Sequence, residues 1–379
     1  MLLIKNGYLK TMVGKDIENG CLLIGDDGKI LEIDESIDAP DNAEVINAEG
    51  RLVTPGCVEA HCHIGLGDLS GKDYNESSSP ITPEMRAIDG INPQNEVFKN
   101  AIRVGVTSVC TGPGSANIVG GTFAAIKCYG KRIDDMIIKN PVAMKCAFGE
   151  NPKKAFGQNG KAPKTRMGTA ALLREFLFKS KKYYDDKQAG ANPSFDFKLE
   201  AMLPVMAGEI PLKAHAHRAD DIFTAIRIAK EFNLKLTLDH CTEGALIAAE
   251  LAKEGYPAFI GPSMGNASKY ELLNKSFTTP AILNSVGVDI AIITDAGVIP
   301  IQYLPLVAGM AVKSGLPYEE AWKAITVNPA TLTVIGDRVG SLEVGKDGDV
   351  VIWQADPLRE VGTEAHITVI DGRVVYIAE

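Results

Sequence analysis

Between about residues 55 and 335, strand-like and helix-like segments alternate along the chain. Apolar runs at 211–217 and 234–241 are each followed by a stretch with helical periodicity, at 218–232 and 243–255. Repeated strand–helix units of this length favour a parallel sheet, and about eight of them favour a closed (β/α)8 barrel, the TIM barrel. We therefore predict an α/β protein whose barrel domain spans residues 55–335.

The two ends of the chain have a different pattern. Residues 1–54 and 336–379 contain short alternating apolar runs joined by turns, including Asp-Gly pairs at 27–28 and 371–372 that are typical of hairpins. Two strand-rich ends around a different middle predict one small β-sandwich domain built from both termini.

Composition limits the class of partner. The formal net charge of -9 argues against nucleic acid, because no basic field would collect phosphates. The seven cysteines contain no CxxC pair, so we expect reduced thiols of a cytoplasmic protein.

The N-terminal apolar run is broken at Lys5, which is not typical of a signal peptide. The uncharged run 296–312 contains prolines and is short for a membrane span. We expect a small-molecule substrate and neither a nucleic-acid nor a membrane partner.

Polar residues stand where the predicted strands end. His61 and His63 flank Cys62, and alternate side chains of a strand point to the same face, so the two imidazoles converge. Two converging imidazoles supply half of a metal site. The later strands end in the same kind of residue, namely His215, His217, His240 and Asp295. A single buried histidine is usually a packed core residue, but several strand ends that deliver histidines to one rim of a barrel predict a site.

These motifs resemble the amidohydrolase superfamily. The resemblance rests on PGCVEAHCH at 55–63, HAHR at 215–218, the Asp239-His240 and Thr294-Asp295 pairs, and the closing segment VGSLEVGKDGDVVIW at 339–353. The branch it resembles is that of the imidazolonepropionase-related amidohydrolases and metallo-dipeptidases. The resemblance implies a metal at the barrel mouth, a homo-oligomer, and a ligand set comprising His61, His63, His215, His240 and Asp295. His217 shares a face with His215, so it either touches substrate or replaces His215 as the ligand.

The ligand from the fourth strand stays open between two residues. Strand periodicity turns Lys145 inward, which favours a carboxylated lysine that bridges two metals. Glu150 lies nearer the strand end, beyond Gly149, and needs no carbon dioxide adduct. The alternative role of Lys145 is to pair with a carboxylate in the barrel, and that of Glu150 is to cap a helix or loop.

The predicted chemistry is hydrolysis of a C–N bond by metal-activated water. Zinc is the default ion, one or two per chain, although other divalent transition metals accept the same ligands. Asp295 accepts the proton of the water and passes it to the leaving nitrogen, and His217 polarises the carbonyl oxygen. The expected substrate is a small cyclic amide, an N-acyl amino acid or a dipeptide, and deamination on the same metal site is an alternative. Residues such as Tyr74 and the basic cluster around Lys153 and Arg166 are candidates for substrate contact, and a solvated surface is the other explanation for that cluster.

A serine esterase is the alternative from another chemistry. Residues 261–265, GPSMG, match the GxSxG elbow, and Asp295 and His366 follow Ser263 in the order found in α/β-hydrolases. Pro262 constrains that elbow, His366 falls inside a predicted strand, and the histidines of the other strands would have no purpose. A barrel that has lost catalysis is a third reading, but such a protein would usually lack one of the expected ligands.

Overall fold

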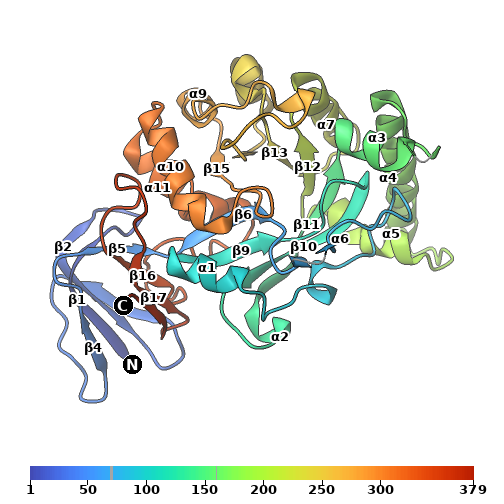
Figure 1. The fold of residues 1–379 in the computed structure, drawn as a ribbon. Coiled ribbons are helices and arrows are strands. Elements are labelled where there is room, and N and C mark those ends of the chain that lie inside the picture. Colours follow the sequence, from blue (N-terminus) through green and yellow to red (C-terminus); the bar gives the residue numbers. More distant parts are fainter. Residues whose placement is uncertain (69–70, 159) are drawn as a thin grey trace.

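The computed structural model describes residues 1–68, 71–158 and 160–379. An eight-stranded barrel sheet forms its centre, in the order β15-β14-β13-β12-β11-β10-β9-β6 (Figure 1). Its strands are β6 (Cys57–Cys62), β9 (Val106–Thr111), β10 (Val119–Lys127), β11 (Ile137–Ala147), β12 (Leu212–Ala216), β13 (Leu236–His240), β14 (Ala258–Ile260) and β15 (Ile290–Ile292).

One strand departs from the predicted all-parallel pattern. β10 pairs antiparallel with both β9 and β11, whereas β6 is parallel to β9, and β11 to β15 are parallel to one another. The connection at 112–118 is too short for a crossover helix, so β10 returns as a hairpin strand. The expectation of strict βα repeats is therefore wrong at this point, although the α/β class and the eight-stranded barrel are correct.

The barrel is nearly closed between its edge strands β6 and β15. The backbone N–H of His63 donates to the carbonyl oxygen of Ala296 at 2.6 Å, directly beyond the ends of these two strands. Residues at the carboxyl ends of β6 and β15 are thereby held side by side.

Helices cover the outside of the barrel sheet (Figure 1). They are α1 (Val97–Arg103), α2 (Ile133–Met136), α3 (Glu150–Gly157), α4 (Arg166–Gln188), α5 (Phe197–Ala201), α6 (Leu203–Met206), α7 (Ala219–Glu231), α8 (Ala248–Glu254), α9 (Thr279–Ser285), α10 (Leu304–Lys313), α11 (Tyr318–Lys323) and α12 (Val327–Leu332), with 3-10 turns η1 (Ala87–Asp89), η2 (Gly244–Ile247), η3 (Tyr270–Leu272) and η4 (Ile301–Tyr303). In α7, buried Ile222, Ala225, Ile226 and Ala229 form one apolar stripe against the sheet. Each such helix returns the chain so that the next parallel strand ends at the same rim.

Both termini contribute to a second sheet, in the order β18-β17-β16-β5-β1-β2-β3, with β4 paired to β1. Its strands are β1 (Leu2–Leu9), β2 (Ile17–Ile24), β3 (Ile30–Asp34), β4 (Glu44–Asn47), β5 (Leu52–Pro55), β16 (Val350–Trp353), β17 (Ala365–Ile370) and β18 (Arg373–Ile377), while β7 (Gly67–Asp68) and β8 (Gly71–Lys72) form a separate ribbon. The two chain ends lie together in it (Figure 1). The pairings give one sheet, so a two-layer sandwich and the domain limits 1–54 plus 336–379 and 55–335 stay predictions.

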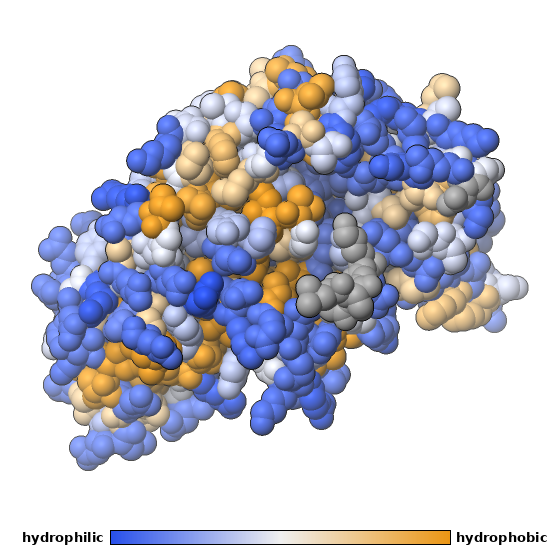
Figure 2. Space-filling model, in the orientation of Figure 1, coloured by the Kyte–Doolittle hydropathy of each residue, from blue (hydrophilic) through white to orange (hydrophobic). Residues whose placement is uncertain are grey.

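The surface seen in Figure 2 is mainly hydrophilic, and its hydrophobic residues form separate patches. All seven cysteines are buried and unpaired. Among the residues that the structure describes, no helix combines the length and the apolar character needed to cross a membrane.

Candidate metal centre

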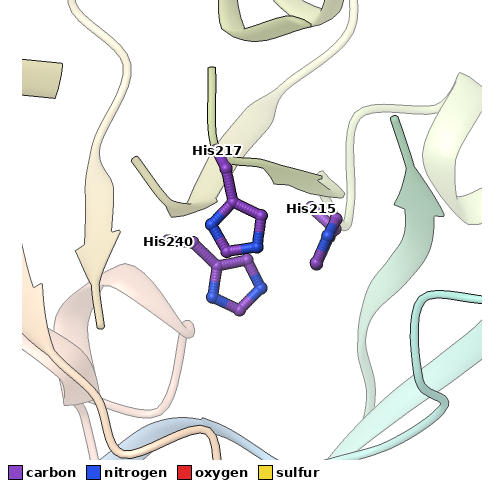
Figure 3. A group of neighbouring side chains, drawn as sticks. All are labelled: His215, His217 and His240. Atoms are coloured by element: carbon purple, nitrogen blue, oxygen red, sulfur yellow. The ribbon is translucent and has the colours of Figure 1, made fainter. Parts of the chain in front are cut away.

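Five of the six histidines and Asp295 converge at the carboxyl ends of the barrel strands, in two groups. One group is His61, His63 and Asp295, and the other is His215, His217 and His240; within each group the potential ligand atoms lie within 4.8 Å of one another. The rings of the second group approach one another from neighbouring strand ends (Figure 3). The structure thus brings together every histidine and the aspartate that the strand-end pattern singled out.

In the first group, both imidazoles face Asp295. Its Oδ1 lies 3.4 Å from His61 Nε2 and 3.2 Å from His63 Nε2. The Nδ1 atom of each ring contacts a different partner. His63 Nδ1 donates to the carbonyl oxygen of Gly112 at 2.7 Å, and His61 Nδ1 lies 3.1 Å from Asp239 Oδ2. Anchored Nδ1 atoms leave Nε2 as the ligand atom of each ring.

The second group is anchored in the same way. His240 Nδ1 donates to the carbonyl oxygen of Gly261 at 2.7 Å, and His217 Nδ1 lies 2.7 Å from Thr242 Oγ1. The Nε2 of His240 is buried, and no described residue forms a hydrogen bond with it. His215 differs, because its Nε2 is 3.3 Å from Asn151 Nδ2. A buried nitrogen that lacks a partner fits a metal ligand better than a packing residue.

Burial keeps the imidazoles of the second group neutral. Desolvation lowers the pKa of His240 to about 3, and desolvation together with neighbouring histidines holds the pKa values of His215 and His217 well below the ordinary range. Burial opposes ionisation of Asp295, but the hydrogen bonds from His61 and His63 keep its pKa well below the usual value. Neutral imidazoles and an ionised carboxylate are the protonation states that bind a divalent cation.

The backbone is strained where the ligand strands end. His240 has φ 77° and Asp295 has φ 53°, in the left-handed region that non-glycine residues seldom occupy. Such strain persists only where surrounding contacts impose it, and it is concentrated at functional sites.

The structure separates the two candidates for the fourth-strand ligand. The Nζ of Lys145, on β11, is fully buried, 3.5 Å from His61 Nε2 and 2.8 Å from Asp239 Oδ2. The carboxylate of Glu150, at the start of α3, instead accepts the backbone N–H of Glu271 at 3.3 Å. Lys145 therefore lies beside the first group, whereas the carboxylate of Glu150 contacts the backbone of Glu271.

Asp239 also contributes to the centre, although its place in the sequence motif predicted no role for it. Its Oδ1 lies 2.9 Å from Lys213 Nζ, and its Oδ2 contacts both His61 and Lys145. Burial opposes its ionisation, but His61, Lys145 and Lys213 hold its pKa well below the ordinary value. The sequence signal was its place directly before His240, where two consecutive polar residues end an apolar strand.

A cavity of about 370 Å³ opens onto the two groups. Its wall includes His63, His217 and Asp295, together with Tyr74, whose ring stacks on His63 at 4.8 Å between centroids. Lys153 and Arg166 line a separate pocket of about 660 Å³, and Arg166 is bound to Asp221 at 2.9 Å. Of the predicted substrate contacts, Tyr74 and Lys154 of the basic cluster therefore line the cavity at the candidate centre.

The residues of the serine esterase alternative are not brought together. Asp295 contacts His61 and His63, whereas His366 lies in β17 of the terminal sheet. Ser263 follows β14 in the loop near the cavity, so no relay from Asp295 through His366 to Ser263 is formed.

A family model described as the amidohydrolase family matches residues 52–375. The chain belongs to the amidohydrolase family. This confirms the resemblance of the sequence motifs and places the protein among hydrolases that act on carbon–nitrogen bonds. Amidohydrolases are generally metal-dependent, in agreement with the two groups of histidine and aspartate described above.

Alignments with similar proteins cover nearly the whole chain. An amidohydrolase structure from Thermotoga maritima MSB8 has a TM-score of 0.95 and 38% identity, and the match covers 100% of both chains. The amidohydrolase tasK of Hapsidospora irregularis is 30% identical over 92% of this chain, which spans only 39% of that relative's length. An imidazolonepropionase from Maricaulis maris (strain MCS10) is 26% identical, over 95% of this chain and 94% of its own.

Proposed function

We propose that this amidohydrolase is a metal-dependent enzyme that hydrolyses the C–N bond of a small cyclic amide, an N-acyl amino acid or a dipeptide. The observation that carries the proposal is the convergence of His61, His63 and Asp295 with a second histidine group at one end of the barrel. The imidazolonepropionase relatives favour the cyclic amide among these substrates. Deamination on the same centre is the alternative activity.

The donor set fits a divalent transition metal. His61, His63 and Asp295 would hold one ion, and His215, His217 and His240 supply donors for a second. Lys145 is the fourth-strand residue that we place at the centre, as a carboxylated side chain between the groups. A bound ion supplies Lewis acidity and lowers the pKa of a water to near neutrality, and zinc is the default for these ligands.

The residues of the chain supply the remaining chemistry. Asp295 is ionised and touches both imidazoles of its group, so it can accept a proton from water and return it to the leaving nitrogen. His217 lies on the cavity wall with its Nδ1 held by Thr242, so its Nε2 would either bind the second ion or, in a protein with one ion, polarise the substrate carbonyl. Tyr74 stacks on His63 and limits access of bulk water on that side.

The position of Lys154 indicates where an anionic group of the substrate would bind. It lines both the cavity and the neighbouring pocket that holds Lys153, Lys164, Arg166 and Arg218. Arg166 and Arg218 are bound to Asp221 and Asp220. The lysines of this pocket form no ion pair with any residue that the structure describes, so they are the cations that we expect to meet a ligand there. We propose that a substrate carboxylate lies near Lys154, with the scissile bond near Asp295.

A screen of the zinc-loaded protein tests this function. The panel contains cyclic amides, N-acyl amino acids and dipeptides, with amino-substituted ring compounds to detect deamination, and product formation is followed by mass spectrometry. Hydrolysis that a chelator abolishes and zinc restores would support the proposal. Turnover that survives the chelator and is blocked by a serine-directed fluorophosphonate would overturn it in favour of the esterase.

A further inference from the structure

The loop between β14 and α9 places an acid against the second histidine group. Glu271, in η3, is 1% exposed. Its Oε1 lies 4.0 Å from His215 Nε2 and 3.9 Å from His217 Nε2. The sequence pattern did not identify this residue, because it comes from a loop and not from a strand end.

Glu150 and Glu271 hold each other in a reciprocal pair. The backbone N–H of Glu150 donates to Glu271 Oε2 at 2.9 Å, and that of Glu271 donates to Glu150 Oε1 at 3.3 Å. One oxygen of Glu271 is thereby fixed by the start of α3, and the other is turned toward the histidines. Gly149 is matched to this arrangement, because a Cβ there would lie 2.6 Å from Glu271 Oε2.

The charge balance around the second group also points to Glu271. Three neutral imidazoles bring no negative charge, so a carboxylate beside them would offset part of the charge of a buried divalent cation, in addition to any charge that a carboxylated Lys145 supplies. Asp295 faces the first group, and Asp239 is engaged by Lys145 and Lys213. Glu271 is therefore the carboxylate beside His215 and His217.

Lys269 competes for the same carboxylate. Its Nζ lies 2.7 Å from Glu271 Oε1 and donates to Asn151 Oδ1 at 2.7 Å. Lys269 is about one-quarter exposed, so its ammonium can turn to solvent when another cation takes its place.

We propose that Glu271 is the carboxylate partner of a divalent cation held by His215, His217 and His240. The proposal rests on the metal centre of the proposed function and adds a residue from outside the strand ends. Two ligand atoms of one zinc ion lie about 3–4 Å apart, so the present separations need only a small side-chain adjustment. Glu150, one of the two residues considered for the fourth-strand ligand, then acts by positioning Glu271.

The test is metal binding and does not depend on a substrate. Four proteins are loaded with zinc and dialysed: wild type, E271Q, K269M and E250Q. E250Q is the control, because Glu250 is an exposed residue of α8. Zinc equivalents are measured by elemental analysis, and dissociation constants by competition with a chelator. We expect two equivalents in wild type and E250Q, and a second equivalent that is bound about 10–100-fold more weakly in E271Q. K269M should bind it roughly threefold more tightly, because the competing ammonium is gone.

Several results would overturn this inference. The first is a single tightly bound zinc equivalent in wild type. The second is wild-type affinity for both zinc ions in E271Q. The third is loss of both zinc ions from E271Q while its circular dichroism and melting temperature stay unchanged. If E271Q does not fold, K269M decides, because an unchanged second dissociation constant there contradicts a role for Glu271. Failure of the proposed function is a separate result, namely no turnover in the screen by protein that carries two zinc ions.

Discussion

The carboxylate of Glu59 on β6 links the two edges of the barrel by binding Thr294 beyond β15. Its Oε2 accepts the backbone N–H of Thr294 at 2.9 Å and the Thr294 hydroxyl at 2.6 Å, while Oε1 accepts the N–H of His61 at 3.1 Å. The group is fully buried, and desolvation raises its pKa to about 7. One side chain thus fixes Asp295 relative to His61 and His63.

Replacing Glu59 should loosen this junction. In E59Q the side chain keeps one acceptor oxygen, and its new NH2 group faces a donor of Thr294 or His61. At least one buried donor therefore loses its acceptor. We expect the free energy of unfolding to fall by about 1–3 kcal/mol. Urea denaturation measures this, with E32Q on the exposed side of β3 as the control. Equal stability of E59Q and wild type would show that the link is dispensable.

Loss of the Asp295 carboxylate should remove turnover and leave much of the metal. D295N keeps the shape of the side chain but cannot accept the proton, so we expect kcat to fall by about 10²–10⁴-fold. D289N, at an exposed position beside the start of β15, is the matched control. Steady-state kinetics on the substrate found in the screen, with zinc content measured in parallel, makes the comparison. Near-normal kcat in D295N would exclude the proton-transfer role.

The two fourth-strand candidates should differ in their effect on metal binding. Lys145 lies beside His61, so K145A should lower the zinc content. E150Q retains an oxygen to accept the N–H of Glu271, so its zinc content should be close to that of wild type. Elemental analysis compares the two, and intact-protein mass spectrometry looks for an added carboxyl group on Lys145. The opposite order of zinc loss would assign the ligand to Glu150.

Lys154 should contribute to the binding of anionic substrates and not to the chemical step. We expect K154Q to raise KM about tenfold for a substrate with a free carboxylate, through loss of a charge-assisted hydrogen bond, while kcat changes little. The same substrate with its carboxylate amidated should show no difference between K154Q and wild type. K161Q, at an exposed position in the following loop, controls for general charge. Equal KM changes for both substrate forms would contradict carboxylate recognition.

A buried ion-pair cluster joins β10 to the C-terminal segment. Lys127 Nζ lies 2.8 Å from Asp347 Oδ2, 2.8 Å from Asp349 Oδ1 and 3.1 Å from Asp371 Oδ1. Removing the cation leaves the buried carboxylate of Asp349 without an ion-pair partner among the described residues, so K127M should cost about 3–5 kcal/mol of stability. K131M, exposed in the loop after β10, serves as the control in urea denaturation at pH 7.

The same cluster predicts sensitivity to acid. Burial opposes ionisation of Asp347, but Lys127 and the other cations hold its pKa below the ordinary aspartate value of about 3.9. Its contribution to stability is therefore present above about pH 4 and is lost as pH falls through the lowered folded-state pKa. Urea denaturation from pH 5 to pH 2.5 should show a smaller loss of stability in K127M than in wild type. Parallel pH curves would contradict this assignment.

The sequence by itself determined the α/β class, the rim of the barrel and the histidine set. Alternation in a strand turned His61 and His63 to one side, and parallel strands delivered His215, His240 and Asp295 to the same end, because these are local rules of backbone geometry. Adjacency of Asp239 to His240 was also visible, although its contacts were not.

Only the tertiary structure decided which side chains meet. The antiparallel course of β10, the Glu59 link and the position of Glu271 against His215 depend on pairings between segments far apart in the chain. Neither periodicity nor spacing encodes such contacts, since a loop carries no repeating pattern that would show where its side chains point. For the same reason the sequence kept both Lys145 and Glu150 open with a slight preference for Glu150, whereas the contacts of Lys145 with His61 and of Glu150 with Glu271 appear only in the tertiary structure.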